Sequence, residues 1–353
     1  MTDDLSGLRA GLAAGRKQPR SPRSTSGRVS MAMVASRAGV SGQTVSRVVN
    51  NSPRVDPATR VRVEQAMAEL GYRPHRAARA LRTGRSQTLG IVATTLATVG
   101  NSRMLQATAE AAASRGYALT VVTAIRDVKE AFARLREQGV DGALVLNEAS
   151  ALTHESDRPE GLRLVVIDAA ADSGFRTVSS DHAGGGAAAT HHLLQLGHAT
   201  VHHLAGPEAS FAAAERERGW WQALQTAGIE VPPVARGDWS AESGNAAVAA
   251  LESATAVFSA NDQMALGLIR ALEDLGRRVP EDVSVIGFDD VPDAANFRPP
   301  LTTIRQDFPR LAADAVTALV ADIEAGSRGD ESREVEPHVV PTHLIERHST
   351  HGA

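Results

Sequence analysis

Hydrophobic and polar positions follow two different patterns along the chain, and the change falls near residue 88. Between residues 30 and 71 the apolar residues recur at helical spacing in short pieces, each bounded by a capping residue or a glycine. From Thr88 onward, short apolar strands alternate with amphipathic helices, which is typical of parallel sheets built from βαβ units. The pattern predicts a small helical domain followed by a larger α/β domain.

Three short helices are predicted in the first domain. The first is capped by Ser30 and ends before Gly39, and the third is capped by Asp56 and ends before Gly71. Their apolar faces predict one shared core, which consists of Met33, Val34, Ala38, Val40, Val45, Val48, Val49, Val63, Met67 and Leu70.

The second predicted helix, residues 42–50, is capped by Ser41 and has an outward face of polar side chains. Gln bonds adenine bidentately and Arg bonds guanine, so such a face suits a helix that lies in the major groove of DNA. A helix-turn-helix that binds DNA is therefore predicted. The outward face consists of Gln43, Thr44, Ser46 and Arg47.

The charge of the chain is divided at nearly the same place. Residues 1–89 hold 16 Lys and Arg against 5 Asp and Glu, a balance of +11, whereas the remainder holds 21 against 36, a balance of −15. Positive charge at this density is what neutralisation of DNA phosphates requires. Residues 1–28, rich in Ser, Pro, Gly and Arg, are predicted to be a disordered basic extension.

The second domain is predicted to contain two doubly wound halves. Such halves bind ligands at the carboxyl ends of their strands, where they face each other. The expected strands are residues 89–93, 118–123, 142–146, 164–167, 201–204, 256–259 and 283–288.

Polar side chains follow several of these strands. Carboxylates and amides bond adjacent hydroxyls, a guanidinium adds directional donors, and an indole covers the apolar side of a sugar ring. Together they predict a carbohydrate pocket, although each alone has a structural alternative as a helix cap or a core residue. The set is Arg126, Asn147, Asp168, Arg216, Trp239, Asn261 and Asp289.

Composition argues against several other classes of protein. Hydrophobic residues make up 42% and charged residues 22%, which is ordinary for a globular protein of two or three domains. No apolar run approaches the roughly 18 residues of a membrane helix, and no export signal follows Met1. The absence of cysteine excludes disulfides and thiolate metal sites. A cytoplasmic protein without membrane contact is expected.

Enzymatic function is not expected, because the catalytic and cofactor motifs are missing. Neither a GK[ST] phosphate loop nor a G-x-S-x-G elbow is present, and the glycines at 184–186 lack dinucleotide-binding spacing and instead suit a closely packed helix start. The pairs His191-His192 and His202-His203 are adjacent, so each pair points to different faces and does not chelate a metal. Neither a cofactor nor a metal site is predicted.

Two runs in the first domain carry a resemblance to a known family. Residues 38–50 (AGVSGQTVSRVVN) and 60–74 (RVRVEQAMAELGYRP) resemble the DNA-binding headpiece of the lactose-repressor family of transcription regulators. The resemblance implies that Gly42, Gln43 and Arg47 read the operator, with Ser41, Thr44, Ser46 and Asn50 in the same interface. The founding member of the family has tyrosine where this chain has Gly42, so the operator bases are expected to differ.

The resemblance also implies a hinge between the domains. Residues 75–83, bounded by Pro74 and Gly84, are too few to hold a helix alone in water and are expected to order on DNA. Leu81 would wedge between base pairs in the minor groove, beside Ala78, while Arg76 and Arg79 lie along phosphates. A plain basic linker is the alternative interpretation.

In the second domain, residues 237–241 (GDWSA), 259–267 (SANDQMALG), 284–290 (SVIGFDD) and 299–308 (PPLTTIRQDF) are similar to the founding member in particular, and the resemblance extends over residues 29–347. It implies a two-lobed, periplasmic-binding-protein-like core and a galactoside ligand. A loop at residues 98–104 replaces a more apolar pocket wall of that member, so a different partner sugar is expected on the aglycone side. The implied contacts are Asn147, Asp168, Arg216, Trp239, Asn261, Asp289, Gln306 and Phe308, with Arg126 near the mouth.

The predicted organisation is thus a headpiece at residues 29–73, a hinge at 74–87, a ligand-binding and dimerisation core at 88–347 and a tail at 348–353. We expect a homodimeric repressor that leaves double-stranded operator DNA when a sugar such as lactose or allolactose binds. A tetramer is not expected, because the last residues show no leucine heptads. Open alternatives are a regulator of another glycoside, a co-repressor-dependent regulator, and a sugar-transport binding protein.

Overall fold

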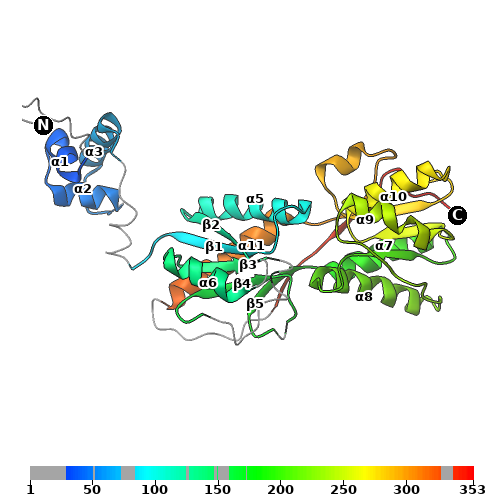
Figure 1. Ribbon diagram of the computed structural model, residues 1–353. Coiled ribbons are helices and arrows are strands. Elements are labelled where there is room, and N and C mark those ends of the chain that lie inside the picture. The colour runs from blue at the N-terminus through cyan, green and yellow to red at the C-terminus, as the bar shows by residue number, and fades with distance from the viewer. Residues whose placement is uncertain are drawn as a thin grey trace, which may run out of the picture. The chain divides into compact units, whose positions relative to one another are not determined.

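The computed structural model describes residues 29–50, 52–72, 84–124, 127–146, 149, 159–171, 173–326 and 337–353. The chain divides into two compact units, residues 1–75 and 76–353 (Figure 1). The predicted hinge contacts at Arg76, Ala78, Arg79 and Leu81 lie outside the described residues, as do Arg126 and Asn147.

The first unit is a bundle of α1 (Met31–Ala38), α2 (Gly42–Val49) and α3 (Pro57–Leu70). Ser30, Ser41 and Asp56 each accept a hydrogen bond from the first turn of their helix, which is why the helices begin where they do. Met33 was expected in the core but is 47% exposed. Ala35 and Ala66 take its place, in a core formed by Val34, Ala35, Val45, Val48, Val63, Ala66 and Tyr72.

The second unit contains two six-stranded sheets, and each belongs to one lobe. The first lobe has the strand order β11-β5-β4-β3-β1-β2. Its strands are β1 (Thr88–Ala93), β2 (Ala118–Thr123), β3 (Gly142–Val145), β4 (Arg163–Ile167), β5 (Arg176–Ser180) and β11 (His338–Val340).

The second lobe has the order β12-β10-β9-β8-β6-β7. All neighbouring strands are parallel in both sheets except β12, which runs antiparallel to β10. Its strands are β6 (His202–Ala205), β7 (Ala235–Arg236), β8 (Ala256–Ser259), β9 (Ser284–Asp289), β10 (Thr302–Arg305) and β12 (His343–Ile345).

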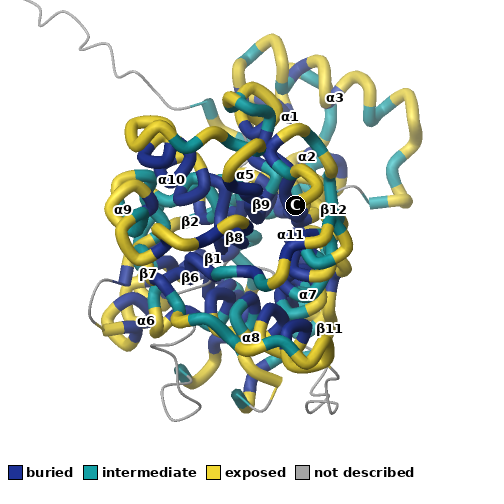
Figure 2. The backbone as a smooth tube through the Cα atoms, turned by 90° about the vertical axis from the view of Figure 1, so that its right-hand side faces the viewer, coloured by how far each residue is buried: buried dark blue, intermediate teal, exposed yellow. Residues whose placement is uncertain are grey.

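Helices cover both faces of each sheet, so the central strands are buried on both sides (Figure 2). In the first lobe α5 (Val99–Ser114) and α11 (Phe308–Gly326) pack on one face and α6 (Val128–Glu137) on the other. In the second lobe α7 (His182–Gln195) and α8 (Phe211–Thr226) lie opposite α9 (Ala241–Ala246) and α10 (Asp262–Asp274). Short 3-10 helices at Ala247–Leu251 and Pro292–Asn296 complete this lobe.

The chain passes between the lobes after β5, after β10 and after β11. These crossings place the ends of several strands at the boundary of the lobes (Figure 1). Residues 98–104 were expected to form a loop, but Thr98 caps α5 and the helix begins at Val99. The prediction was wrong because the Thr98 side chain supplies a cap of its own, accepting from the Asn101 amide.

Candidate functional site

The outward face of α2 presents the polar side chains that were predicted to read DNA. Gln43 and Arg47 are exposed, while Val45 and Val48 are buried in the bundle. Ser41 caps the helix, and its hydroxyl lies 2.9 Å from that of Thr44. This arrangement leaves the long side chains of the face directed away from the core, as a recognition helix requires.

Two positions on α2 differ from simple exposed readers. The amide nitrogen of Asn50 donates to the Ser46 carbonyl, so Asn50 closes the carboxyl end of the helix as well as bordering its outward face. A side chain at Gly42 would meet no atom within 4 Å. Gly42 therefore leaves open space on the surface where other sequences can carry a large residue.

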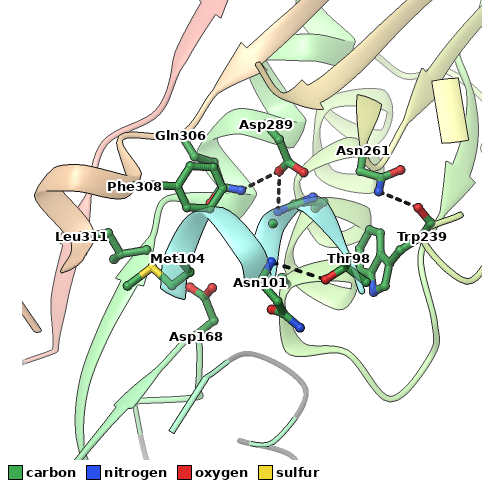
Figure 3. Close-up of a pocket in the computed structure, with 13 residues that line it drawn as sticks. Thr98, Asn101, Met104, Asp168, Trp239, Asn261, Asp289, Gln306, Phe308 and Leu311 are labelled. Atoms are coloured by element: carbon green, nitrogen blue, oxygen red, sulfur yellow. Dashed lines mark hydrogen bonds and ion pairs between the residues drawn. The ribbon is translucent and has the colours of Figure 1, made fainter. Parts of the chain in front are cut away.

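A pocket lies between the two lobes of the second unit (Figure 3). It brings together seven residues predicted from the sequence, which are Asp168, Arg216, Trp239, Asn261, Asp289, Gln306 and Phe308. The remaining lining residues, which the sequence did not indicate as ligand contacts, are Thr98, Gly100, Asn101, Met104, Ala212 and Leu311.

Arg216 is the central charged group of the pocket and is only 4% exposed. Its guanidinium lies 3.4 Å from the Asp289 carboxylate, donates to the Ala260 carbonyl, and lies 3.8 Å from the centroid of the Phe288 ring. Gln306 donates to the same Asp289 carboxylate at 2.6 Å. The second lobe therefore holds a buried charge pair whose geometry is fixed by several neighbours.

Burial raises the pKa of the Asp289 carboxyl group, and the nearby Arg216 charge and the Gln306 hydrogen bond offset only part of that effect. Behind it, the fully buried Asp262 has a pKa raised well above its usual value, because it is desolvated and lies near the Asp289 charge. Asp262 accepts hydrogen bonds from the Thr303 hydroxyl at 2.5 Å and from the Val291 amide at 2.8 Å. Two carboxyl groups thus lie in the interior at this end of the sheet.

Asp168 is the carboxylate that the first lobe contributes. It follows β4 with a positive φ of 56°, a conformation that few residues other than glycine adopt, and it is 4% exposed. Its Oδ1 accepts from the Ser180 amide at 3.2 Å. The same oxygen lies 2.9 Å from Nε2 of His182, the first residue of α7.

Asn261 and Trp239 form the second-lobe side of the pocket. Asn261 Oδ1 accepts from the Met264 amide and so caps α10, while its Nδ2 donates to the Trp239 carbonyl at 3.0 Å. Asn261 is therefore both a helix cap, which was the alternative interpretation of such residues, and part of the pocket lining. The Trp239 ring packs against Gly206, where an added Cβ would lie 2.3 Å from the ring.

The first-lobe side combines a cluster of apolar side chains with the polar residues Asp168, Asn101 and Thr98. Figure 3 shows Met104, Phe308 and Leu311 gathered opposite Asn261 and Trp239. Asn101 is buried among them, and its amide donates to the Thr95 carbonyl at 3.0 Å. The pocket therefore offers the charge network of the second lobe and an apolar cluster of the first lobe to a ligand with both polar and apolar groups.

Some buried polar atoms at the pocket have no hydrogen-bond partner in the structure. Among them are Nε1 of Trp239 and Oε1 of Gln306, one a donor and one an acceptor. Buried polar groups are normally paired, so an unpaired donor and acceptor beside a pocket indicate that a ligand or water bonds them. Hydroxyl groups can satisfy both kinds of atom.

No three His, Cys, Asp or Glu side chains are grouped so that they could hold a metal ion in the ranges given above. Within those same ranges, no helix is long and apolar enough to cross a membrane.

Comparison with protein families and known sequences gives two matches and several relatives. Residues 30–75 match the lacI family of bacterial regulatory proteins, and residues 190–350 match a periplasmic binding protein-like domain. The chain is 36% identical to the lactose operon repressor of Escherichia coli strain K12 over 298 residues, covering 81% of this chain and 82% of that protein. It is 34% identical to the regulator CelR of Thermobifida fusca, covering 91% of this chain and 98% of CelR.

Solved structures agree with these matches. The lac repressor dimer bound to operator and the anti-inducer ONPF has a TM-score of 0.79 and 34% identity, covering 92% of this chain and all of that chain. The CelR–cellobiose complex has a TM-score of 0.66 and 33% identity, covering 91% of this chain and all of that chain.

Proposed function

We propose that this chain, which belongs to the lacI family of bacterial regulatory proteins, is a repressor that binds operator DNA as a homodimer and leaves it when a galactoside occupies the pocket. The family match at residues 30–75 covers α1, α2 and α3 and argues against a transport binding protein. The relatives described above are regulators rather than enzymes.

The observation that carries the sugar proposal is the pairing of two walls. One wall holds Arg216, Asp289 and Gln306 in a fixed hydrogen-bonded arrangement, and the other holds Met104, Phe308 and Leu311. Sugar rings present hydroxyls on their edges and C–H groups on their faces, so they match carboxylates and guanidinium on one side and apolar groups on the other.

The DNA proposal rests on α2. Its exposed Gln43 and Arg47 are side chains that bond base edges, and a two-fold dimer would place two such helices on a near-palindromic operator. The lac repressor structure named above is a dimer on its operator. For this chain, the operator contacts at Ser41, Gly42, Thr44, Ser46 and Asn50 and the whole hinge, including Arg76, Ala78, Arg79 and Leu81, remain part of the proposal.

The mechanism that we propose is a shift between two orientations of the lobes. One orientation allows both hinge segments to order on the operator, and the sugar binds the other orientation more tightly. Linkage then requires that operator DNA weakens sugar binding by the same factor by which sugar weakens DNA binding.

A second candidate ligand is a glucoside such as cellobiose. It is favoured by the CelR–cellobiose complex, whose identity to this chain differs by only one percentage point from that of the operator-bound lac repressor. Residues 98–104, which were expected to change one wall of the pocket as a loop, do not separate the two ligands, because they form the cap and first turns of α5.

Fluorescence anisotropy tests the proposal. The full chain is bound to a palindromic operator from its own upstream region and titrated with lactose, allolactose, galactose, cellobiose and glucose. Release by galactosides alone supports the galactoside proposal, and release by cellobiose alone transfers it to glucosides. Tighter DNA binding in the presence of a sugar would make the ligand a co-repressor and overturn the proposed direction of control.

A further inference from the structure

We propose that Arg103 and His182, neither of which lines the pocket, are positioning residues that each hold a pocket carboxylate residue of the opposite lobe. Arg103 on the first lobe holds Asp289 of the second, and His182 on the second lobe holds Asp168 of the first. This inference rests on the proposed sugar-binding function and names the residues that would make the pocket depend on the orientation of the lobes.

Arg103 lies on the first turns of α5 and reaches across to the end of β9. Its Nη1 donates to the carbonyl of Asp289 at 3.2 Å and to that of Asp290 at 3.0 Å. Both acidic residues have positive φ, 109° and 48°, so the chain turns there through a conformation unfavourable for residues with a Cβ. A charged donor shared by the two carbonyls stabilises this turn and thereby the direction of the Asp289 side chain.

The position of Arg103 is fixed by a second contact. Its guanidinium lies 4.7 Å from the centroid of the Phe308 ring, which is buried and belongs to α11 of the first lobe. The cation–π contact holds the guanidinium on its own lobe. The hydrogen bonds to Asp289 and Asp290 therefore depend on the position of the second lobe.

His182 makes the reciprocal connection. Arg216 Nε lies 3.3 Å from His182 Nδ1 and is its donor, because a guanidinium has no acceptor atom. Nδ1 is therefore unprotonated in the neutral ring, and the proton is on Nε2, 2.9 Å from Asp168 Oδ1. His182 thus links the Arg216 guanidinium to the Asp168 carboxylate through one buried imidazole.

The second connection is close but not fully aligned. Although Nε2 is within contact distance of Asp168, its direction does not satisfy hydrogen-bond geometry. Because Asp168 and His182 belong to different lobes, a small rotation of one lobe changes this alignment and the Arg103 contacts together. The pocket is consequently complete in one range of lobe orientations, and a bound sugar stabilises that range.

Matched substitutions in the full chain test the inference. His182→Leu and Arg103→Met remove the two connections, and His182→Gln keeps a donor and an acceptor at nearly the same places. His198→Leu, beyond the other end of α7, and Arg115→Met, at the other end of α5, are the controls, since each side chain bonds only within its own lobe among the contacts described. Sugar binding is measured by calorimetry with lactose and with cellobiose, and folding by thermal unfolding.

Each of the two removals should weaken binding of the sugar that the wild type takes by about tenfold or more. Arg103→Met removes the charged donor of two carbonyls, and His182→Leu removes the acceptor of the Arg216 guanidinium together with the contact to Asp168. His182→Gln should recover most of the loss, and the controls should bind as the wild type does. The double variant should lose less than the product of the two single losses, because both connections select the same orientation. Unchanged affinity in His182→Leu and Arg103→Met, or a loss in His182→Gln equal to that in His182→Leu, would overturn the inference.

A readout without sugar separates this inference from the proposed function. Nitrogen NMR of the His182 ring in the free protein should show the proton on Nε2 and an unprotonated Nδ1. A proton on Nδ1 would overturn the His182 connection even if sugars bind. If no sugar binds the wild type, the proposed ligand class fails, and the His182 tautomer still decides whether the connection exists.

Discussion

The two lobes share one strand order but differ in the number of charged side chains that they bury. In both sheets the last strand in the sequence, β11 or β12, lies at one edge. The order β5-β4-β3-β1-β2 then corresponds to β10-β9-β8-β6-β7 across the rest of the sheet. Yet the second lobe buries Arg216, Asp262 and Asp289, whereas Asp168 is the one buried charged residue among the described residues of the first. One sheet topology therefore supports either a charged interior or an apolar one.

Helix packing differs in the same direction. In the second lobe α7 and α8 approach so closely that a Cβ on Gly219 would lie 2.0 Å from the Ala183 carbonyl, and one on Gly186 would lie 2.4 Å from that of Arg216. In the first lobe α5 and α11 are held apart by larger side chains such as Met104 and Leu311. The close glycine packing fixes Arg216 relative to α7, so the second lobe provides the rigid half of the pocket.

Removing the central charge should give the largest effect. Arg216→Met leaves Asp289 buried without its cation, and we expect the free energy of unfolding to fall by roughly 3–5 kcal/mol and sugar binding to be lost. Denaturant unfolding measures the first and calorimetry the second. The control is Arg270→Met, an exposed i,i+4 partner of Asp274, which should change stability by less than about 1 kcal/mol. Equal losses in both variants would contradict the greater importance of buried charge over exposed charge in the second lobe.

Separating the glycine-packed helices should have an intermediate effect. Gly219→Ala forces α7 and α8 apart because the backbone of Ala183 cannot yield as a flexible side chain does, and we expect a loss of about 1–3 kcal/mol. Gln222→Ala on the exposed side of α8 is the control. If Gly219→Ala unfolds at the same denaturant concentration as the wild type, the second lobe is less rigid than the close approach implies.

A buried histidine should make the second lobe sensitive to acid. Burial lowers the pKa of His203 to about 3, although its hydrogen bond to the Phe258 carbonyl acts in the opposite direction. Its contribution is therefore fully present above its unfolded pKa of 6.5 and is lost as the pH falls toward 3, at up to about 1.4 kcal/mol per pH unit. His203→Phe should lose this part of the pH dependence, whereas His191→Asn on the surface should keep it. Unfolding at pH 7.5, 6 and 5 measures the difference.

The smallest effect is expected in the apolar wall of the first lobe. Met104 is buried, and Met104→Leu exchanges one uncharged side chain for another of nearly the same volume. The free energy of unfolding should therefore change by less than about 1.5 kcal/mol. Sugar affinity should change less than in Arg216→Met. A larger loss of affinity in Met104→Leu would show that the apolar wall, rather than the charge network, decides binding.

Local signals account for what the sequence predicted correctly. A side chain directly before each helix of the headpiece caps its first turn. All seven predicted strands are present, and all except β6, which begins with two histidines, are short and mainly apolar. The strands missed were β5, β7, β10, β11 and β12. Of these, β5 (RTVSS) and β10 (TTIR) are polar for buried strands, and β7, β11 and β12 have only two or three residues, so their pairing is set by tertiary contacts.

The pocket residues also divide into those that a local sequence signal predicts and those that only tertiary contacts bring into place. Asp168, Asn261 and Asp289 were found because residues that follow parallel strands meet at one edge of a sheet. Ala212 was missed because it reaches the pocket from the start of α8, and no spacing in the sequence relates that start to the strand ends. Asn101 lies within residues 98–104, which were expected at the pocket as a loop rather than as the start of a helix. His182 was missed because its place is defined by two residues from distant segments, Asp168 and Arg216.

The three crossings between the lobes have a consequence for synthesis of the protein. The edge strand of the first lobe, β11, comes from residues His338–Val340, although the sheet that it completes begins at Thr88. A ribosome therefore releases the DNA-binding helices long before either lobe can close its sheet. A chain broken off before β11 would carry the three helices of the headpiece but no finished lobe, so the pocket between the lobes depends on translation to the last strands.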